Sequence, residues 1–305
     1  MEKLKKIICI FFLSIIIILQ CACDKNISID SNTGNKKKVI KNLDIMVTNK
    51  DLYNIVKNIA GDDNNLEFML KNENENEDFT YTDDSTSNIG KQDLFIYTGA
   101  GFENWIDDFL NKVDKSKVSI INSSRGVSIL NYNNKSAKNY GQKNPYYWMD
   151  IDNYRTMLLN IKNAIEEKDP KNRNLYETNF RNAIKDIDGY KESMKDISSK
   201  MSGYTIVTDT DKFDYFLKSQ NLNNIKFYRN DQGNISPEDN QRISVEKDNE
   251  KKLCFIYDDD NDLNQNKDII DRYNIQTIKL TVYNGDMSYI DILKGNMESI
   301  KNVIK

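Results

Sequence analysis

Histidine is absent from this 305-residue chain. Without imidazole, Ser-His-Asp and Cys-His catalysis, histidine-rich zinc sites and pH switches near neutrality are excluded. Cysteine is also scarce. The chain has four cysteines, and three of them lie at positions 9, 21 and 23, near its start. The remaining thiol, Cys254, has no partner for a disulfide framework, so the fold must depend on its hydrophobic core. Any metal site must use oxygen ligands or Cys254.

An excess of positive charge is missing as well. The formal net charge is -4, and no domain-sized stretch is basic, which argues against a nucleic-acid partner. Hydrophobic residues make up 38% of the chain and charged residues 30%, a mixture that supports an ordinary globular core. The length is sufficient for two lobes of ordinary size.

Residues 1–22 have the features of a bacterial signal peptide. A lysine-rich start precedes an apolar run from Ile7 to Leu19, which is short for a membrane-spanning helix of roughly 20 residues. The run ends in L-Q-C-A-C-D, so we predict cleavage before Cys23 and lipid attachment to that residue. Residues 23–41 would then be a flexible tether at the extracellular face of the cell membrane. Cleavage before Cys21 and an uncleaved N-terminal anchor are the alternatives.

The rest of the chain alternates between predicted strands and helices. Strands are expected at 42–48, 66–70, 93–98, 118–121, 204–208, 225–228, 253–257 and 277–281. Residues 72–90 and 131–149 are expected to be irregular, and the longest helix is expected from Pro170 to about Lys200. The pattern predicts an α/β fold with two lobes, each a mostly parallel four-stranded sheet flanked by helices. The predicted divisions are a lobe at 42–168, a connecting helix at 169–202 and a lobe at 203–305.

Four stretches of the chain resemble motifs of one known family. They are D-L-F-I-Y-T-G-A-G-F-E-N-W at 93–105, N-P-Y-Y-W-M-D at 144–150, A-I-E-E-K-D-P-K-N-R-N-L-Y-E-T-N at 164–179 and I-V-T-D-T-D-K-F-D-Y-F at 206–216. In this order they resemble the zinc- and manganese-binding solute-binding lipoproteins of ABC transporters. The resemblance implies capture of a solute between two lobes and delivery to a permease and its ATPase, by a monomer that is not an enzyme.

The resemblance also implies a metal site with three histidines and one carboxylate in the cleft. At the matching positions this chain has Phe79, Tyr146, Thr210 and Thr281. A phenyl ring cannot coordinate a metal, threonine hydroxyls are weak ligands, and tyrosine ordinarily ionises only near a pKa of about 10. We therefore expect no zinc site of the family type.

Three alternatives remain for the cleft. Oxygen ligands, with Asp78, Asp209 and Asp211 as candidates, would suit a divalent cation such as manganese or calcium better than zinc. An aromatic pocket would take a different ligand, and its candidate lining is Phe79, Tyr81, Tyr146, Tyr147 and Trp148. In the third alternative the cleft is filled, and the protein is a repurposed surface scaffold, similar to an adhesin, that binds no metal.

Overall fold

The computed structural model describes residues 42–304, apart from residues 72, 134–138, 231 and 283. The predicted signal peptide, Cys23 and the tether lie outside the described residues. Among the helices that are described, none is long and apolar enough to cross a membrane.

The first lobe is built on a parallel sheet with the strand order β2-β1-β3-β4. Its strands are β1 (Asp44–Asn49), β2 (Asn65–Leu70), β3 (Leu94–Tyr97) and β4 (Ser119–Asn122). Successive side chains of a strand point to opposite faces. Ile45 and Val47 therefore join one core cluster, with residues of α2 (Lys50–Ala60) and α6 (Ile151–Lys168).

The opposite face of this sheet carries a second cluster. Phe95 of β3 packs there with Ile89 of α4 (Asp83–Ile89) and Phe109 of α5 (Ile106–Lys112). A short helix, α3 (Glu73–Glu77), follows β2. The first sheet is thus covered on both faces, as a parallel sheet requires.

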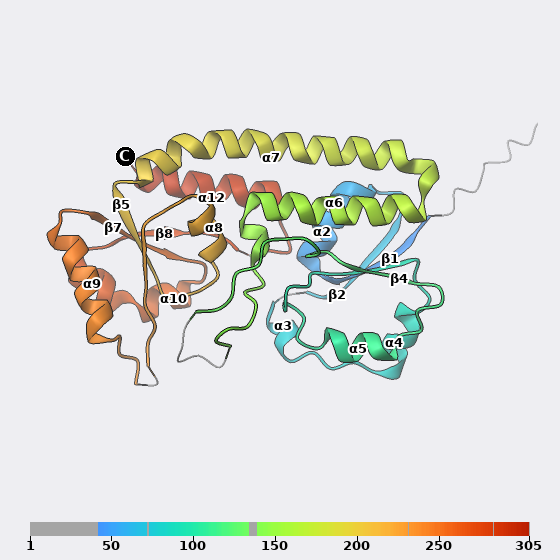
Figure 1. Cartoon of the computed structure of the whole chain (residues 1–305), viewed down its shortest axis with the longest axis horizontal. Coiled ribbons are helices and arrows are strands. Elements are labelled where there is room, and N and C mark those ends of the chain that lie inside the picture. Colours follow the sequence, from blue (N-terminus) through green and yellow to red (C-terminus); the bar gives the residue numbers. More distant parts are fainter. Residues whose placement is uncertain (1–41, 72, 134–138, 231, 283, 305) are drawn as a thin grey trace, which may run out of the picture. The chain divides into compact units, whose positions relative to one another are not determined.

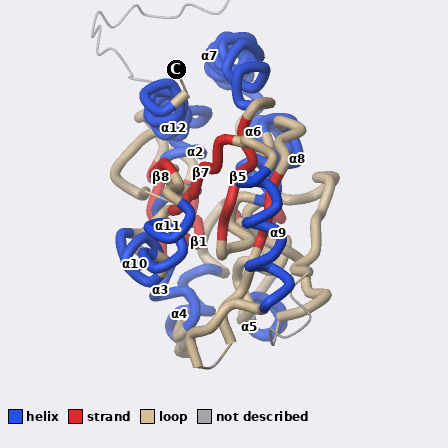
Figure 2. The backbone as a smooth tube through the Cα atoms, turned by 90° about the vertical axis from the view of Figure 1, so that its left-hand side faces the viewer, coloured by secondary structure: helices blue, strands red, loops and turns tan. Residues whose placement is uncertain are grey.

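The second lobe repeats this plan with the strand order β6-β5-β7-β8. Its strands are β5 (Tyr204–Thr208), β6 (Asn224–Lys226), β7 (Lys252–Tyr257) and β8 (Gln276–Lys279). Its helices are α8 (Asp214–Ser219), α9 (Pro237–Asp248), α10 (Asp260–Gln265), α11 (Lys267–Tyr273) and α12 (Tyr289–Val303). Seen end-on, helices surround the strands (Figure 2). The two parallel sheets confirm the predicted fold class.

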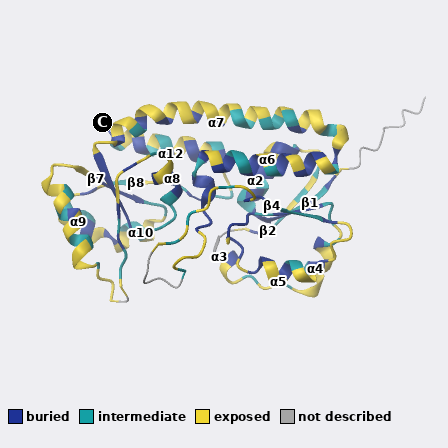
Figure 3. Cartoon of the chain, viewed as in Figure 1, coloured by how far each residue is buried: buried dark blue, intermediate teal, exposed yellow. Residues whose placement is uncertain are grey.

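One long helix, α7 (Arg173–Met201), runs along both lobes (Figure 1). It follows a 3-10 turn at Pro170–Asn172 and packs against α2, α6 and α12. Its buried residues recur at helical spacing and form one apolar stripe. They are Tyr176, Ile187, Tyr190, Met194, Ile197 and Met201. The outward side of α7 is largely exposed (Figure 3).

One prediction about local structure was wrong, and one helix was not predicted. Residues 72–90 are not a loop throughout, because they contain α3 and α4. Thr82 begins α4 with a capping box that it forms with Ser85, and such a cap stabilises a short polar helix. Helix α9 was not predicted, although Ser236 caps it and Pro237 occupies its first turn.

Candidate functional site between the lobes

The candidate site is a narrow cleft between the two lobes. Asn49 and Thr98, at the carboxyl ends of β1 and β3, line it together with Met287 and Tyr289 near the start of α12. Ligands of open α/β sheets bind outside the carboxyl ends of the strands, so this is the expected place for a site. The cavity measures about 20 Å³, which is room for about one water molecule. Side chains therefore fill most of the cleft.

Trp148, in the aromatic segment 146–148, provides part of this filling. Trp148 packs edge-on against Phe102, with 5.6 Å between ring centroids, and against Tyr146 at the same separation. Its indole N–H donates to the carbonyl of Val282 in the second lobe, at 3.2 Å. Trp148 thus joins the lobes by packing and by a hydrogen bond.

Tyr147 points into the first lobe instead of the cleft. Its hydroxyl donates to the Thr98 carbonyl at 2.9 Å and lies 3.0 Å from Ser123 Oγ. Burial raises the pKa of Tyr147 well above its usual value. This tyrosine is therefore a neutral hydrogen-bonding group and not a phenolate ligand.

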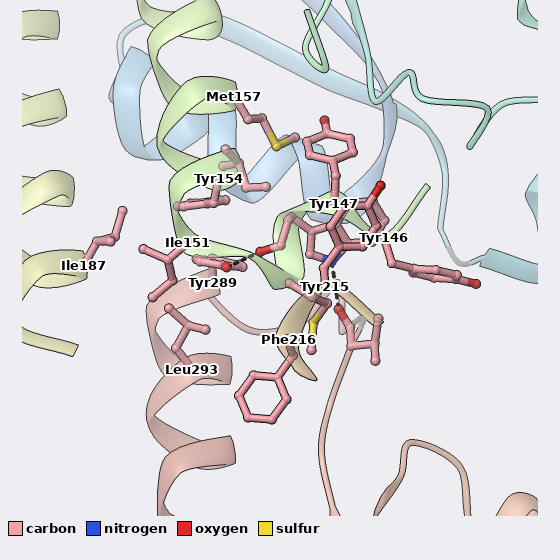
Figure 4. Packing of buried hydrophobic residues seen from close by; sticks show 14 of the residues in the cluster. Tyr146, Tyr147, Ile151, Tyr154, Met157, Ile187, Tyr215, Phe216, Tyr289 and Leu293 are labelled. Atoms are coloured by element: carbon pink, nitrogen blue, oxygen red, sulfur yellow. Dashed lines mark hydrogen bonds between the residues drawn. The ribbon is translucent and has the colours of Figure 1, made fainter. Parts of the chain in front are cut away.

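Further contacts tie the lobes together around the aromatic segment. The Tyr215 hydroxyl donates to the Asn144 carbonyl at 2.8 Å, and the Asn144 amide donates to the Asp211 carbonyl at 2.8 Å. Tyr289 of α12 stacks on Tyr154 of α6 at 3.6 Å and donates its hydroxyl to the Trp148 carbonyl (Figure 4). These contacts between uncharged groups hold the cleft narrow.

Of the four positions matched to metal ligands, Tyr146 packs against Trp148, which lines the cleft. It is buried, and the Lys212 ammonium lies 5.9 Å from its ring centroid. Thr210 is half-buried just after β5, and its hydroxyl accepts the Lys212 backbone N–H at 3.3 Å. Thr281 exchanges two backbone hydrogen bonds with the Asn296 side chain, at 2.7 and 2.9 Å.

Phe79 lies elsewhere. Its ring packs against Trp105, with 4.3 Å between centroids, in the cluster on the outer face of the first sheet. Tyr81 belongs to the same cluster and packs edge-on against Phe109. The structure therefore does not bring the five proposed aromatic residues into one pocket.

The three candidate acids do not converge either. Asp78 is exposed. Asp209 accepts a hydrogen bond from the Asn266 side-chain amide, and burial raises its pKa. Asp211 pairs with the Lys226 ammonium at 2.6 Å. Over the described part of the chain, no three His, Cys, Asp or Glu side chains are grouped so that they could hold a metal ion.

Cys254 is no substitute for the missing donors. It lies in β7 and is fully buried, and burial raises the pKa of its thiol to about 12. Metals bind the thiolate, which this environment disfavours. The residues present therefore do not fit a zinc site made of nitrogen and sulfur ligands.

Sequence reasoning missed a pair of charged residues near Tyr146. The Lys212 ammonium lies 3.4 Å from Asp258 Oδ2, and Asp258 Oδ1 accepts the Val282 backbone N–H at 3.0 Å. The neighbouring Asp259 caps α10 with its side chain, whereas Asp258 is only 15% exposed.

Comparison with known proteins identifies the scaffold. The family model for the periplasmic component A of the zinc-uptake complex matches residues 45–303. This chain belongs to that family.

Individual relatives are distant but cover most of the chain. The manganese ABC transporter substrate-binding lipoprotein PsaA of Streptococcus pneumoniae serotype 4 is 27% identical over 226 residues, covering 72% of this chain and 69% of the relative. A metal ABC transporter substrate-binding lipoprotein of Lactococcus lactis subsp. lactis is 25% identical, covering 72% of this chain and 70% of the relative.

Solved structures agree on the fold. The metal-dependent lipoprotein YcdH from Bacillus subtilis superimposes with a TM-score of 0.69 at 18% identity, over 85% of this chain and 98% of that one. The Zn(II)-bound ZnuA-like domain of Streptococcus pneumoniae AdcA gives a TM-score of 0.67 at 17% identity, over 86% and 99% of the two chains.

Proposed function

We propose that this protein is the extracellular solute-binding lipoprotein of a metal-type ABC transporter. The observation that carries the proposal is the family match across residues 45–303, which includes both lobes and the long helix. The protein would act by binding and release instead of catalysis, as a monomer held to the membrane by a lipid on Cys23. Its partners would be the permease and the ATPase of the transporter.

The solute that suits this cleft best is a divalent cation with a preference for oxygen, such as manganese or calcium. Zinc is favoured by imidazole and thiolate ligands, whereas harder cations accept carboxylate, hydroxyl and carbonyl oxygens. Asp258 supplies a largely buried carboxylate, and the Lys212 ammonium that pairs with it also lies 5.9 Å from the ring centroid of Tyr146. The manganese named for the streptococcal relative supports the same class of solute.

Cation binding to the mature chain tests this proposal. Calorimetric titration with MnCl2, CaCl2 and ZnCl2, together with thermal melts, should show saturable binding of manganese or calcium and weaker binding of zinc. Asp258→Asn should abolish the cation-induced rise in Tm. Asp260→Asn is the matched control, because Asp260 is exposed and pairs with Lys279 on the surface. A protein whose Tm ignores all three cations would refute a divalent-cation solute, and tight stoichiometric zinc would refute the preference.

A further inference from the structure

Lys212 places a positive charge beside Tyr146, one of the positions matched to a metal ligand. Its side chain comes from the loop after β5 and is 28% exposed. The ammonium lies 3.4 Å from a carboxylate oxygen of Asp258 and 5.9 Å from the ring centroid of Tyr146. A cation that belongs to the chain itself therefore lies next to this position.

One position matched to a metal ligand, Tyr146, adjoins this ammonium. Thr210, a second such position, contacts the backbone of Lys212, whose N–H its hydroxyl accepts. Asp258 also binds the backbone N–H of Val282, the residue that follows Thr281. A cation that binds the Asp258 carboxylate must approach the Lys212 ammonium closely.

Two cations cannot share one carboxylate at such distances without strong repulsion, since electrostatic interactions are large where water is partly excluded. A bound divalent ion must therefore compete with Lys212 for Asp258. We propose that Lys212 is a tethered competitor of the solute: it pairs with Asp258 in the narrow cleft, and a divalent cation binds by displacing it. This inference rests on the proposed function.

The displaced side chain has an alternative partner. Asp262 is half-buried, burial raises its pKa, and the Lys212 charge lowers it, so Lys212 already acts on this second carboxylate. The four-carbon stem of lysine is flexible enough to move between neighbouring acids. Competition of this kind would lower the affinity for the cation and let the lobes stay together without it.

Neutralising Lys212 tests the proposal directly. In calorimetric titrations of the mature chain with MnCl2 and CaCl2, Lys212→Gln should bind at least one of the cations about tenfold more tightly than wild type. Lys279→Gln is the matched control, because it removes the same charge from a surface pair with Asp260 in the same lobe. The control should bind like wild type. The double variant Lys212→Gln/Asp258→Asn should lose the gain.

A second measurement needs no variant. Acetic anhydride labelling of the wild-type chain, followed by mass spectrometry, should modify Lys212 faster at saturating MnCl2 than without it, while the rate at Lys279 stays unchanged. Equal affinities of Lys212→Gln and wild type, or a Lys212 labelling rate that manganese does not raise, would overturn the competition and leave the proposed function intact. If neither wild type nor Lys212→Gln binds either cation, the divalent solute itself is refuted, and the competition with it.

Discussion

The replacement Glu103→Gln tests whether the buried Glu103 carboxylate holds in place the strand ends that line the cleft. Glu103 follows β3 and is 2% exposed. One carboxyl oxygen accepts the Thr98 backbone N–H at 2.8 Å and the Thr48 hydroxyl at 2.5 Å, and the other accepts the Gly99 N–H at 2.9 Å. The side chain thereby fixes the carboxyl ends of β1 and β3, where Thr98 lines the cleft.

The cost of the replacement follows from the number of acceptors. Burial raises the pKa of Glu103, while the hydrogen bonds from Thr48, Thr98 and Gly99 lower it. Glutamine keeps one oxygen but presents an amide N–H₂ at the other position. At least one backbone N–H, from Thr98 or Gly99, then faces another donor. A buried donor left without an acceptor costs about 1–3 kcal/mol, so we expect a loss of about 2 kcal/mol in the free energy of unfolding.

Urea unfolding followed by circular dichroism measures this loss, provided the slope of the transition is unchanged. Glu298→Gln is the control, because Glu298 is exposed and pairs with Lys301 one turn along α12 at 2.7 Å. Exposed pairs of this kind contribute under about 0.5 kcal/mol. If Glu103→Gln is as stable as the control, the carboxylate does not organise the strand ends and the reasoning fails.

Three further predictions concern Tyr289, Asp214 and Cys254. Tyr289→Phe removes the hydroxyl that donates to Trp148 but keeps the aromatic ring, so the free energy of unfolding in urea should fall by about 1 kcal/mol; a wild-type value would contradict a stabilising role. Burial raises the pKa of Asp214 from 3.8 to about 6 despite the nearby Lys226 ammonium. Its stabilising contribution is therefore full below pH 3.8 and lost as the pH rises through 6, so the stability of wild type relative to Asp214→Asn should increase by on the order of 3 kcal/mol on acidification across this window. Urea titrations at several pH values measure the difference, and a constant difference would refute the assigned pKa. Cys254 should react with a thiol reagent only after denaturation, because its thiol is buried with a pKa of about 12; fast labelling of the folded protein would contradict this.

The sequence was most informative where burial dictates residue type. Buried strands such as Leu94–Tyr97 and Lys252–Tyr257 are apolar runs, and α7 shows a clear helical period. Helix α9 buries only Ile243, so its sequence shows almost no apolar periodicity from which a helix could be predicted. The sequence features that mark its start are the cap at Ser236 and the following proline.

The site was predictable only in part. Motif resemblance brought Tyr146 and Thr210 to attention, but the position of Phe79 depends on how the segment after β2 packs against Trp105. The Lys212–Asp258 pair joins residues 46 positions apart. They meet because β5 and β7 are neighbours in the sheet and the loops at their carboxyl ends adjoin. Strand order is a tertiary property that alternation of strands and helices does not specify.

The connection through α7 has a consequence for how the chain can be divided. Each sheet is drawn from one uninterrupted stretch, with β1–β4 ending at Asn122 and β5–β8 beginning at Tyr204. No strand of either sheet comes from the other half of the chain, so each sheet can pair independently. Helix α12 comes last in the chain and packs against α2 and α7, which ties the C-terminal end to the first lobe and the long helix. A chain cut between the lobes would thus yield two fragments that each contain a whole sheet and could be recombined in trans.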